Sequence, residues 1–147
     1  MLVARIPNVR LRASNASPLA SEWRLAALLH DAPEYVVGDL ISPFKAAIGL
    51  DYRAFEERLL AAIHVRFRLP HPLPKDVQIL IKTADRIAAF HEATSLAGFA
   101  PDEANHFFGP VDRLSEPLSI TITQLEAKSV ELAQRAFRAY FESLSKS

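Results

Sequence analysis

The chain has 147 residues, of which 50% are apolar and 23% are charged. It is therefore long enough for one domain with a single core and too apolar for a disordered protein. Lys plus Arg and Asp plus Glu number 17 each. This neutral balance offers no broad cationic surface to a nucleic-acid duplex or an anionic membrane. The absence of cysteine excludes disulfides, thiolate zinc sites and a cysteine nucleophile.

No targeting or membrane segment is evident. The segment 1–7 lacks the basic-then-apolar order of a signal peptide, and no apolar run approaches the length of a membrane span. We therefore expect a cytoplasmic protein that does not associate with a membrane.

The first predicted helix begins at Ser17-Pro18, because serine caps helices well and proline suits the first helical position. It continues to His30-Asp31, and Pro33 kinks or ends it, since proline has no N–H to donate. A short segment over 34–37 then leads to a turn at Gly38.

Asp51 is the predicted N-cap of a second long helix, which reaches Phe67 and ends before two prolines. Pro74 opens the next predicted helix, which ends near Gly98. The apolar residues of this helix recur at helical spacing: Ile79, Leu80, Ala84, Ile87 and Ala88.

Residues 99–116 have the composition of a polar loop, and a last helix is predicted from about Pro117 to Leu144. Alternating apolar and polar runs of strand type are nearly absent. We therefore predict an all-α fold: one domain over 1–147, built as a compact bundle of about four to six helices.

A cluster of metal-binding residue types follows the first helix. His30 and Asp31 are adjacent, Glu34 lies one helical turn after them, and Asp39 follows the turn. Imidazole and carboxylates are good ligands for divalent first-row metals. A single His-Asp pair at a helix end is usually ordinary capping or surface polarity, but four such groups within ten residues favour a functional site.

Asp85 lies in the middle of a later helix whose neighbouring positions are apolar. Aspartate is a poor residue inside a helix, and an aspartate on an apolar face needs a partner. That partner is either a metal ion or a nearby cation, Lys82 or Arg86.

These residues resemble those of the HD-domain phosphohydrolases, and most closely the bacterial 5′-deoxynucleotidase branch of that family. The resemblance covers roughly residues 20–100. It rests on His30-Asp31-Ala-Pro-Glu34, Gly38-Asp39, Ser42-Pro43 and Lys45, and on Lys82-Thr-Ala-Asp85-Arg86.

The resemblance implies an HD-type helical domain that hydrolyses a phosphate ester such as a deoxyribonucleoside 5′-monophosphate. His30, Asp31 and Asp85 would bind one divalent ion (Mn, Co, Ni, Mg, Fe or Zn). Glu34 would be the acid/base group and Asp39 a second active-site carboxylate.

Two cations are candidate phosphate ligands. Lys45 and Arg86 both belong to the pattern, and the guanidinium fork of Arg86 matches phosphate geometry. An ordinary solvated charge is the alternative for each. A homodimer is a further expectation.

Family members carry another metal-binding histidine on an earlier helix, whereas no histidine precedes His30 here. Either upstream helices are missing from this sequence or the protein is a degenerate member, and in both cases we expect the chain as given to be weakly active or inactive. No other histidine replaces this ligand. His91 faces away from Asp85, since it is six residues further along the helix. The remaining three are interpreted as surface residues: His64, His71 and His106.

Two other functions stay open. A degenerate, non-catalytic HD-fold protein could bind a nucleotide or a protein partner. An alarmone-type nucleotide hydrolase is the other alternative, although the relatives associated with that activity have an acidic pair where Glu34 is followed by Tyr35.

Overall fold

The computed structural model describes residues 20–38, 51–111 and 127–145, which form six α-helices and no β-strand. The predicted all-α class is therefore confirmed. The helices are α2 (Ser21–Leu28), α3 (Glu34–Val37), α5 (Tyr52–Arg66), α6 (Lys75–Leu96), α7 (Pro101–Phe108) and α9 (Val130–Ser145). In these ranges no helix is both long enough and apolar enough to cross a bilayer.

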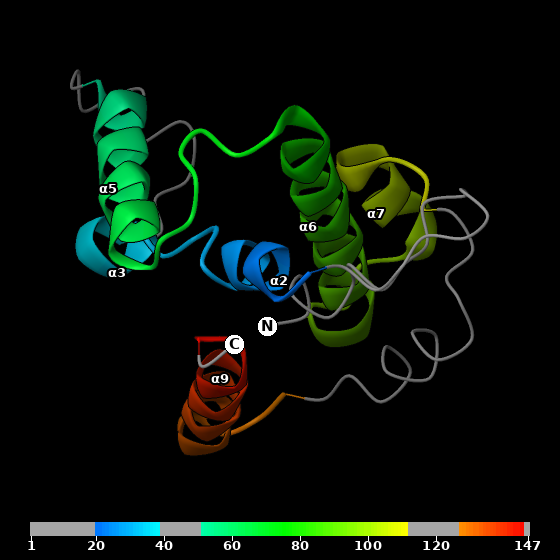
Figure 1. Cartoon of the computed structure of the whole chain (residues 1–147). Coiled ribbons are helices and arrows are strands. Elements are labelled where there is room, and N and C mark those ends of the chain that lie inside the picture. Colours follow the sequence, from blue (N-terminus) through cyan, green and yellow to red (C-terminus); the bar gives the residue numbers. More distant parts are fainter. Residues whose placement is uncertain (1–19, 39–50, 112–126, 146–147) are drawn as a thin grey trace.

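Helix α2 is the central element of the fold. It lies between α5 and α6, with α9 beneath it in the view of Figure 1. Its consecutive residues 25–29 are all buried. A helix that is apolar around its circumference must be covered from several sides. Residues from the surrounding segments complete this core: Leu69, Val77, Ile81 and Leu144.

Helix α9 packs on α2 although the two are distant in sequence. The Arg24 guanidinium donates two hydrogen bonds to the Tyr140 hydroxyl, of 3.2 Å from Nε and 2.8 Å from Nη2. On the same side, the rings of Phe67 and Phe141 meet edge to face with centroids 5.3 Å apart. These contacts hold the last described helix against the core.

Two predicted helix boundaries are confirmed by their caps. The Asp51 carboxylate accepts a hydrogen bond of 3.0 Å from the Ala54 N–H, which satisfies a donor that the first turn of α5 leaves unpaired. Helix α6 starts after Pro74, ends at Leu96 and is followed by Gly98 with φ of 76°. A positive φ is accessible to glycine at little cost.

The predicted apolar stripe of α6 is correct in part. Ala84, Ile87 and Ala88 are buried, but Ile79 is 64% exposed. The other buried apolar residues of this helix are Val77, Ile81 and Ala93.

The predicted ends of the first helix are wrong on both sides. Ala20 is extended, with ψ of 149°, so the helix begins at Ser21 and not at Pro18. It ends at Leu28 and does not reach Asp31. The Leu29 carbonyl accepts a hydrogen bond of 3.0 Å from the Ala32 N–H, which takes the place of the bond that Pro33 cannot donate.

Two C-terminal predictions are also corrected. The expected loop over 99–116 contains α7, which starts with a proline at its first position, has acidic residues in its first turn and ends at Gly109 with φ of 75°. The proline, the acidic residues and the glycine are each favourable at the helix terminus where they occur. Buried Ala104 belongs to this helix, which packs against α6. The expected helix over 117–144 is not continuous, because 127–129 are not helical; its part before 127 lies outside the described residues.

Candidate metal centre

His30 and Asp31 lie in a turn that joins α2 to α3. The turn is built from short-range backbone hydrogen bonds, including Glu34 N–H to the Asp31 carbonyl at 3.0 Å. Buried Leu29 and buried Pro33 hold the turn against the core on either side of the two polar residues. The polar pair is therefore presented from a fixed point at the end of a buried helix.

The three residues predicted as metal ligands lie together. His30 Nε2 is 2.9 Å from Asp31 Oδ2 and 3.6 Å from Asp85 Oδ1. One ligand atom from each residue lies within 4.8 Å of the others. The side chains of His30, Asp31 and Asp85 are 20%, 60% and 53% exposed. A buried helix end and the middle of α6 thus supply one compact group at the protein surface.

A second contact orients the His30 ring. Its Nδ1 lies 2.9 Å from the Ala27 carbonyl, which can only accept, so Nδ1 carries the hydrogen and donates it. Nε2 is then the atom that faces the carboxylates. A ligating histidine in metalloproteins is oriented in the same way, by a hydrogen bond from its other ring nitrogen.

The charge on His30 reflects two opposed effects. Burial penalises the imidazolium and by itself lowers the pKa. The hydrogen bonds and charges of Asp31 and Asp85 outweigh that penalty and raise the pKa of His30 to about 9. In the absence of a metal, a protonated imidazole therefore balances the two carboxylates.

The donor set fits a divalent ion. Metal bonds to imidazole nitrogen and carboxylate oxygen are about 2.0–2.2 Å long, so neighbouring ligand atoms in tetrahedral or octahedral sites are about 3.0–3.6 Å apart. The two distances from His30 Nε2 fall in or next to this range. One imidazole and two carboxylates suit first-row ions and leave coordination positions open.

The apolar residues around Asp85 in the sequence suggested an enclosed side chain. The structure leaves this side chain more exposed than that. The Asp85 side chain is about half exposed, and its ion pair within the described residues is with His30. The alternative of a salt bridge to Arg86 does not describe this arrangement. Arg86 Nη1 instead donates to the carbonyls of Phe108 and Pro110, each at 2.9 Å, and so ties the end of α7 to α6.

A cavity of about 320 Å³ opens on one side of the group. It is lined by residues of the turn, α3 and α5: His30, Asp31, Pro33, Glu34, Arg53, Glu56, Glu57 and Leu60. Glu34, predicted as the acid/base group, is half-buried here beside both proposed ligands of the turn. Arg53 brings a guanidinium to the same cavity.

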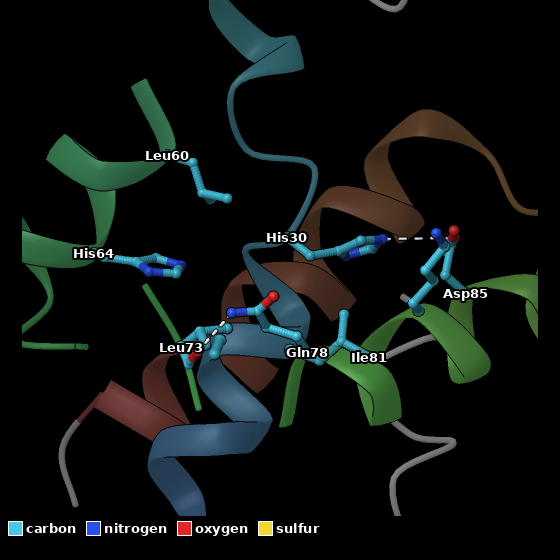
Figure 2. A pocket seen from close by; sticks show the side chains of 9 residues that line it. His30, Leu60, His64, Leu73, Gln78, Ile81 and Asp85 are labelled. Carbon is cyan, nitrogen blue, oxygen red and sulfur yellow. Dashed lines mark hydrogen bonds and ion pairs between the residues drawn. The ribbon is translucent and has the colours of Figure 1, made fainter. Parts of the chain in front are cut away.

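A smaller cavity of about 240 Å³ lies on the other side, between α5 and α6. Figure 2 shows His30 and Asp85 at one end and Leu60 and His64 of α5 across from them. His30 and Leu60 border both cavities, so the group formed by His30, Asp31 and Asp85 lies between the two spaces.

His64 is not a surface residue, and that prediction is wrong. Its side chain is buried, with 1% of the residue exposed. The apolar residues that follow it in the connection to α6, including Leu69 and Leu73, pack over this region of the core. His71 is partly buried and His106 is exposed.

The sequence was then compared with known proteins. No protein-family model matches the chain. An uncharacterized protein of Rhodobacter capsulatus is 52% identical over 100 residues, which cover 67% of this chain and 51% of that protein. The chain thus spans about half the length of the curated relative it matches.

Two predicted site residues, Asp39 and Lys45, lie outside the described residues. Sequence reasoning missed Arg53 and His64. No local motif marks either residue, because each borders a cavity whose other walls come from segments distant in the sequence. A weak signal for His64 was its place one turn after Leu60, on the side of the helix that faces inward.

Proposed function

We propose that this chain carries the active site of a metal-dependent phosphohydrolase that acts on a small phosphate ester, such as a deoxyribonucleoside 5′-monophosphate. The observation that carries the proposal is the convergence of His30, Asp31 and Asp85 from two separate segments. The similarity of these segments to HD-domain phosphohydrolases supports the same function.

The ligand arrangement also supports chemistry rather than a purely structural ion. Structural zinc sites are usually closed by four protein ligands, whereas catalytic sites keep positions open for water or substrate. Here three side chains form a group that is partly exposed and stands between two cavities. A bound divalent ion supplies a Lewis acid that polarises a phosphoryl oxygen and lowers the pKa of water.

Glu34 is the proposed acid/base group. It lies in the same cavity as His30 and Asp31, and its half-buried carboxylate is placed to accept a proton from the attacking water. The water oxygen forms a bond to phosphorus while the bond from phosphorus to the ester oxygen breaks. The same carboxyl group then returns the proton to the departing alkoxide.

Arg53 is the proposed phosphate-binding cation within the described residues. It borders the cavity that contains Glu34 and comes from the first turn of α5. A guanidinium can donate two parallel hydrogen bonds to the non-bridging oxygens of a phosphate. Arg86 is engaged with the backbone at the end of α7, so its predicted phosphate role requires that it leave those carbonyls.

Metal content and phosphate release test the proposal together. The purified chain is stripped with a chelator, reloaded with Mn²⁺, Co²⁺ or Ni²⁺, and assayed with deoxyribonucleoside monophosphates and a generic aryl phosphate. The Asp31→Asn and Asp85→Asn variants should each lose at least about 10–100-fold in metal affinity, the loss typical of changes to groups that only support a ligand.

Asp76→Asn is the matched control, because Asp76 is an exposed aspartate on the same helix as Asp85 and outside the group. It should retain wild-type metal content. If wild-type protein binds no stoichiometric metal under any loading condition, the proposed site is wrong. Because the chain as given is expected to be weakly active or inactive, metal binding decides the site, and any metal-dependent phosphate release supports the phosphohydrolase over the non-catalytic alternative.

A further inference from the structure

The buried imidazole of His64 lies on the wall of the 240 Å³ cavity, next to the proposed metal centre. Its Nε2 is buried and has no hydrogen-bond partner among the described residues. A buried polar atom that is left unpaired destabilises the folded protein. His91 Nε2 is likewise buried and unpaired within the described part of the chain, but His91 does not line this cavity, whereas a ligand bound here is in position to supply the partner of His64.

A series of side-chain contacts determines which tautomer of the His64 ring faces the cavity. His64 Nδ1 lies 3.0 Å from the Pro70 carbonyl, so Nδ1 carries the hydrogen. His71 Nε2 lies 3.2 Å from a Glu57 carboxylate oxygen and also carries its hydrogen. His71 Nδ1 then presents a lone pair to His64 Nδ1–H at 3.4 Å.

These assignments leave a lone pair on His64 Nε2. The neutral ring is favoured because burial lowers the pKa of His64 below 6.5. The Pro70 carbonyl and Glu57 oppose the shift without reversing it. The cavity therefore contains a hydrogen-bond acceptor and calls for a ligand that donates.

The remaining walls define the shape of that ligand. Ala26, Leu60, Leu73 and Ile81 are apolar, and the polar residues that complete the lining are Gln78, Lys82, His30 and Asp85. Figure 2 shows the His64 ring extending from α5 toward the side chains of α6 across this space. Pockets for drug-sized ligands are about 300–1,000 Å³, so 240 Å³ suits one ring rather than a whole nucleotide.

We propose that this cavity binds the sugar ring of a nucleoside monophosphate and that a sugar hydroxyl donates a hydrogen bond to His64 Nε2. This inference rests on the proposed function, because it takes the phosphate of the same substrate to lie at the metal centre. The ring directly attached to the phosphate is the part that reaches this cavity. His64 is then a specificity-determining residue, and Glu57 and His71 are positioning residues that fix its tautomer.

Binding of nucleosides without phosphate tests the cavity separately from catalysis. Thymidine and 3′-deoxythymidine differ only in the 3′-hydroxyl, and their dissociation constants can be measured by calorimetry or by NMR titration. Wild-type protein should bind thymidine about 10–100-fold more tightly, as expected when a buried acceptor loses its donor.

Two substitutions separate the two ring nitrogens. His64→Asn keeps an N–H where Nδ1 donates to Pro70 and removes the cavity acceptor, so the preference for thymidine should fall to near one. His64→Gln places an amide at the depth of Nε2 and should retain part of the preference. His106→Asn is the control, because His106 is exposed on α7 and away from this cavity.

Equal binding of the two nucleosides by wild-type protein, or an unchanged preference in His64→Asn, would overturn the inference. Absence of saturable thymidine binding would overturn it as well. If His64→Asn does not fold, the ¹⁵N resonance of His64 Nε2 in wild-type protein decides: it should shift in a saturable manner with thymidine and not with 3′-deoxythymidine.

The two proposals can fail independently. Nucleoside binding that depends on His64, without stoichiometric metal binding, would contradict the proposed function and leave the sugar site in place. Metal-dependent hydrolysis of an aryl phosphate without thymidine binding would support the proposed function and contradict the sugar site.

Discussion

Arg86→Lys is expected to destabilise the junction of α6 and α7 more than it impairs phosphate chemistry. The Arg86 guanidinium donates from Nη1 to the carbonyls of Phe108 and Pro110, both at 2.9 Å. A Cβ atom added at Gly109 would lie 3.1 Å from Arg86 Nη1, so this nitrogen is in close contact with the turn. Lysine keeps the positive charge but cannot reproduce the planar fork.

The size of the effect follows from these two contacts. Hydrogen bonds to charged groups contribute about 1.5–3 kcal/mol each when well buried. One of the two is partly buried and the other is exposed, which reduces the expected total to about 1–3 kcal/mol. For a domain of this size, about 2–4 °C accompanies each kcal/mol, so the Tm should fall by about 2–12 °C.

Thermal unfolding and steady-state kinetics of the same samples distinguish the two roles. Arg135→Lys, at an exposed position of α9, is the matched control and should leave the Tm unchanged. We expect Arg86→Lys to lower the Tm while KM for the phosphate ester changes less than about threefold, a difference below 1 kcal/mol. An unchanged Tm with KM raised tenfold or more would refute the structural role and support the phosphate contact that the sequence suggested.

Three further expectations follow from the described contacts. In a form of the protein whose turnover is measurable, Glu34→Gln should leave metal content and Tm unchanged and lower turnover by about 10²–10⁴-fold, as expected for the loss of an acid/base group; loss of the metal would instead identify Glu34 as a ligand. Asp51→Ala should lower the free energy of unfolding by about 0.5–2 kcal/mol in a denaturant titration, because it removes the cap on the Ala54 N–H, whereas a stability equal to wild type would show that the cap contributes nothing. Burial lowers the pKa values of His64 and His91 below 6.5 in the folded protein, so the unfolded state takes up protons first and the free energy of unfolding should decrease as the pH falls below 6.5. His30 contributes in the opposite sense, because its raised pKa of about 9 adds stability as the pH falls from about 9, and this contribution is complete only below its unfolded pKa of 6.5. Stability that does not decrease between that point and pH 5 would contradict the burial of the His64 and His91 rings.

The sequence predicted the proposed ligands better than it predicted the cavities around them. His30, Asp31 and Asp85 could be found because they are chemically unusual among apolar neighbours and match a known pattern. Arg53 and His64 resemble ordinary residues of an amphipathic helix. Their positions depend on how α5 packs, and no short-range rule supplies that information.

The same distinction holds for the helices. Asp51 and Pro74 mark helix starts through local hydrogen bonding and a fixed φ, so both boundaries were predicted correctly. The sequence around α7 contains similar signals, but its proline, glycine and many polar residues also match a loop. Ala104, which is fully buried against α6, favours the helix through a contact that the sequence does not show.

The packing of α9 on α2 has a consequence for folding. The hydrogen bonds between Arg24 and Tyr140 join residues 116 positions apart. Closing a loop of that length costs about 4 kcal/mol of chain entropy, apart from a constant. On a ribosome, the apolar α2 is therefore synthesised long before the helix that covers it. During that interval its exposed surface is a target for chaperones and for aggregation, so slower translation of the segment that precedes α9 should lower the yield of folded protein.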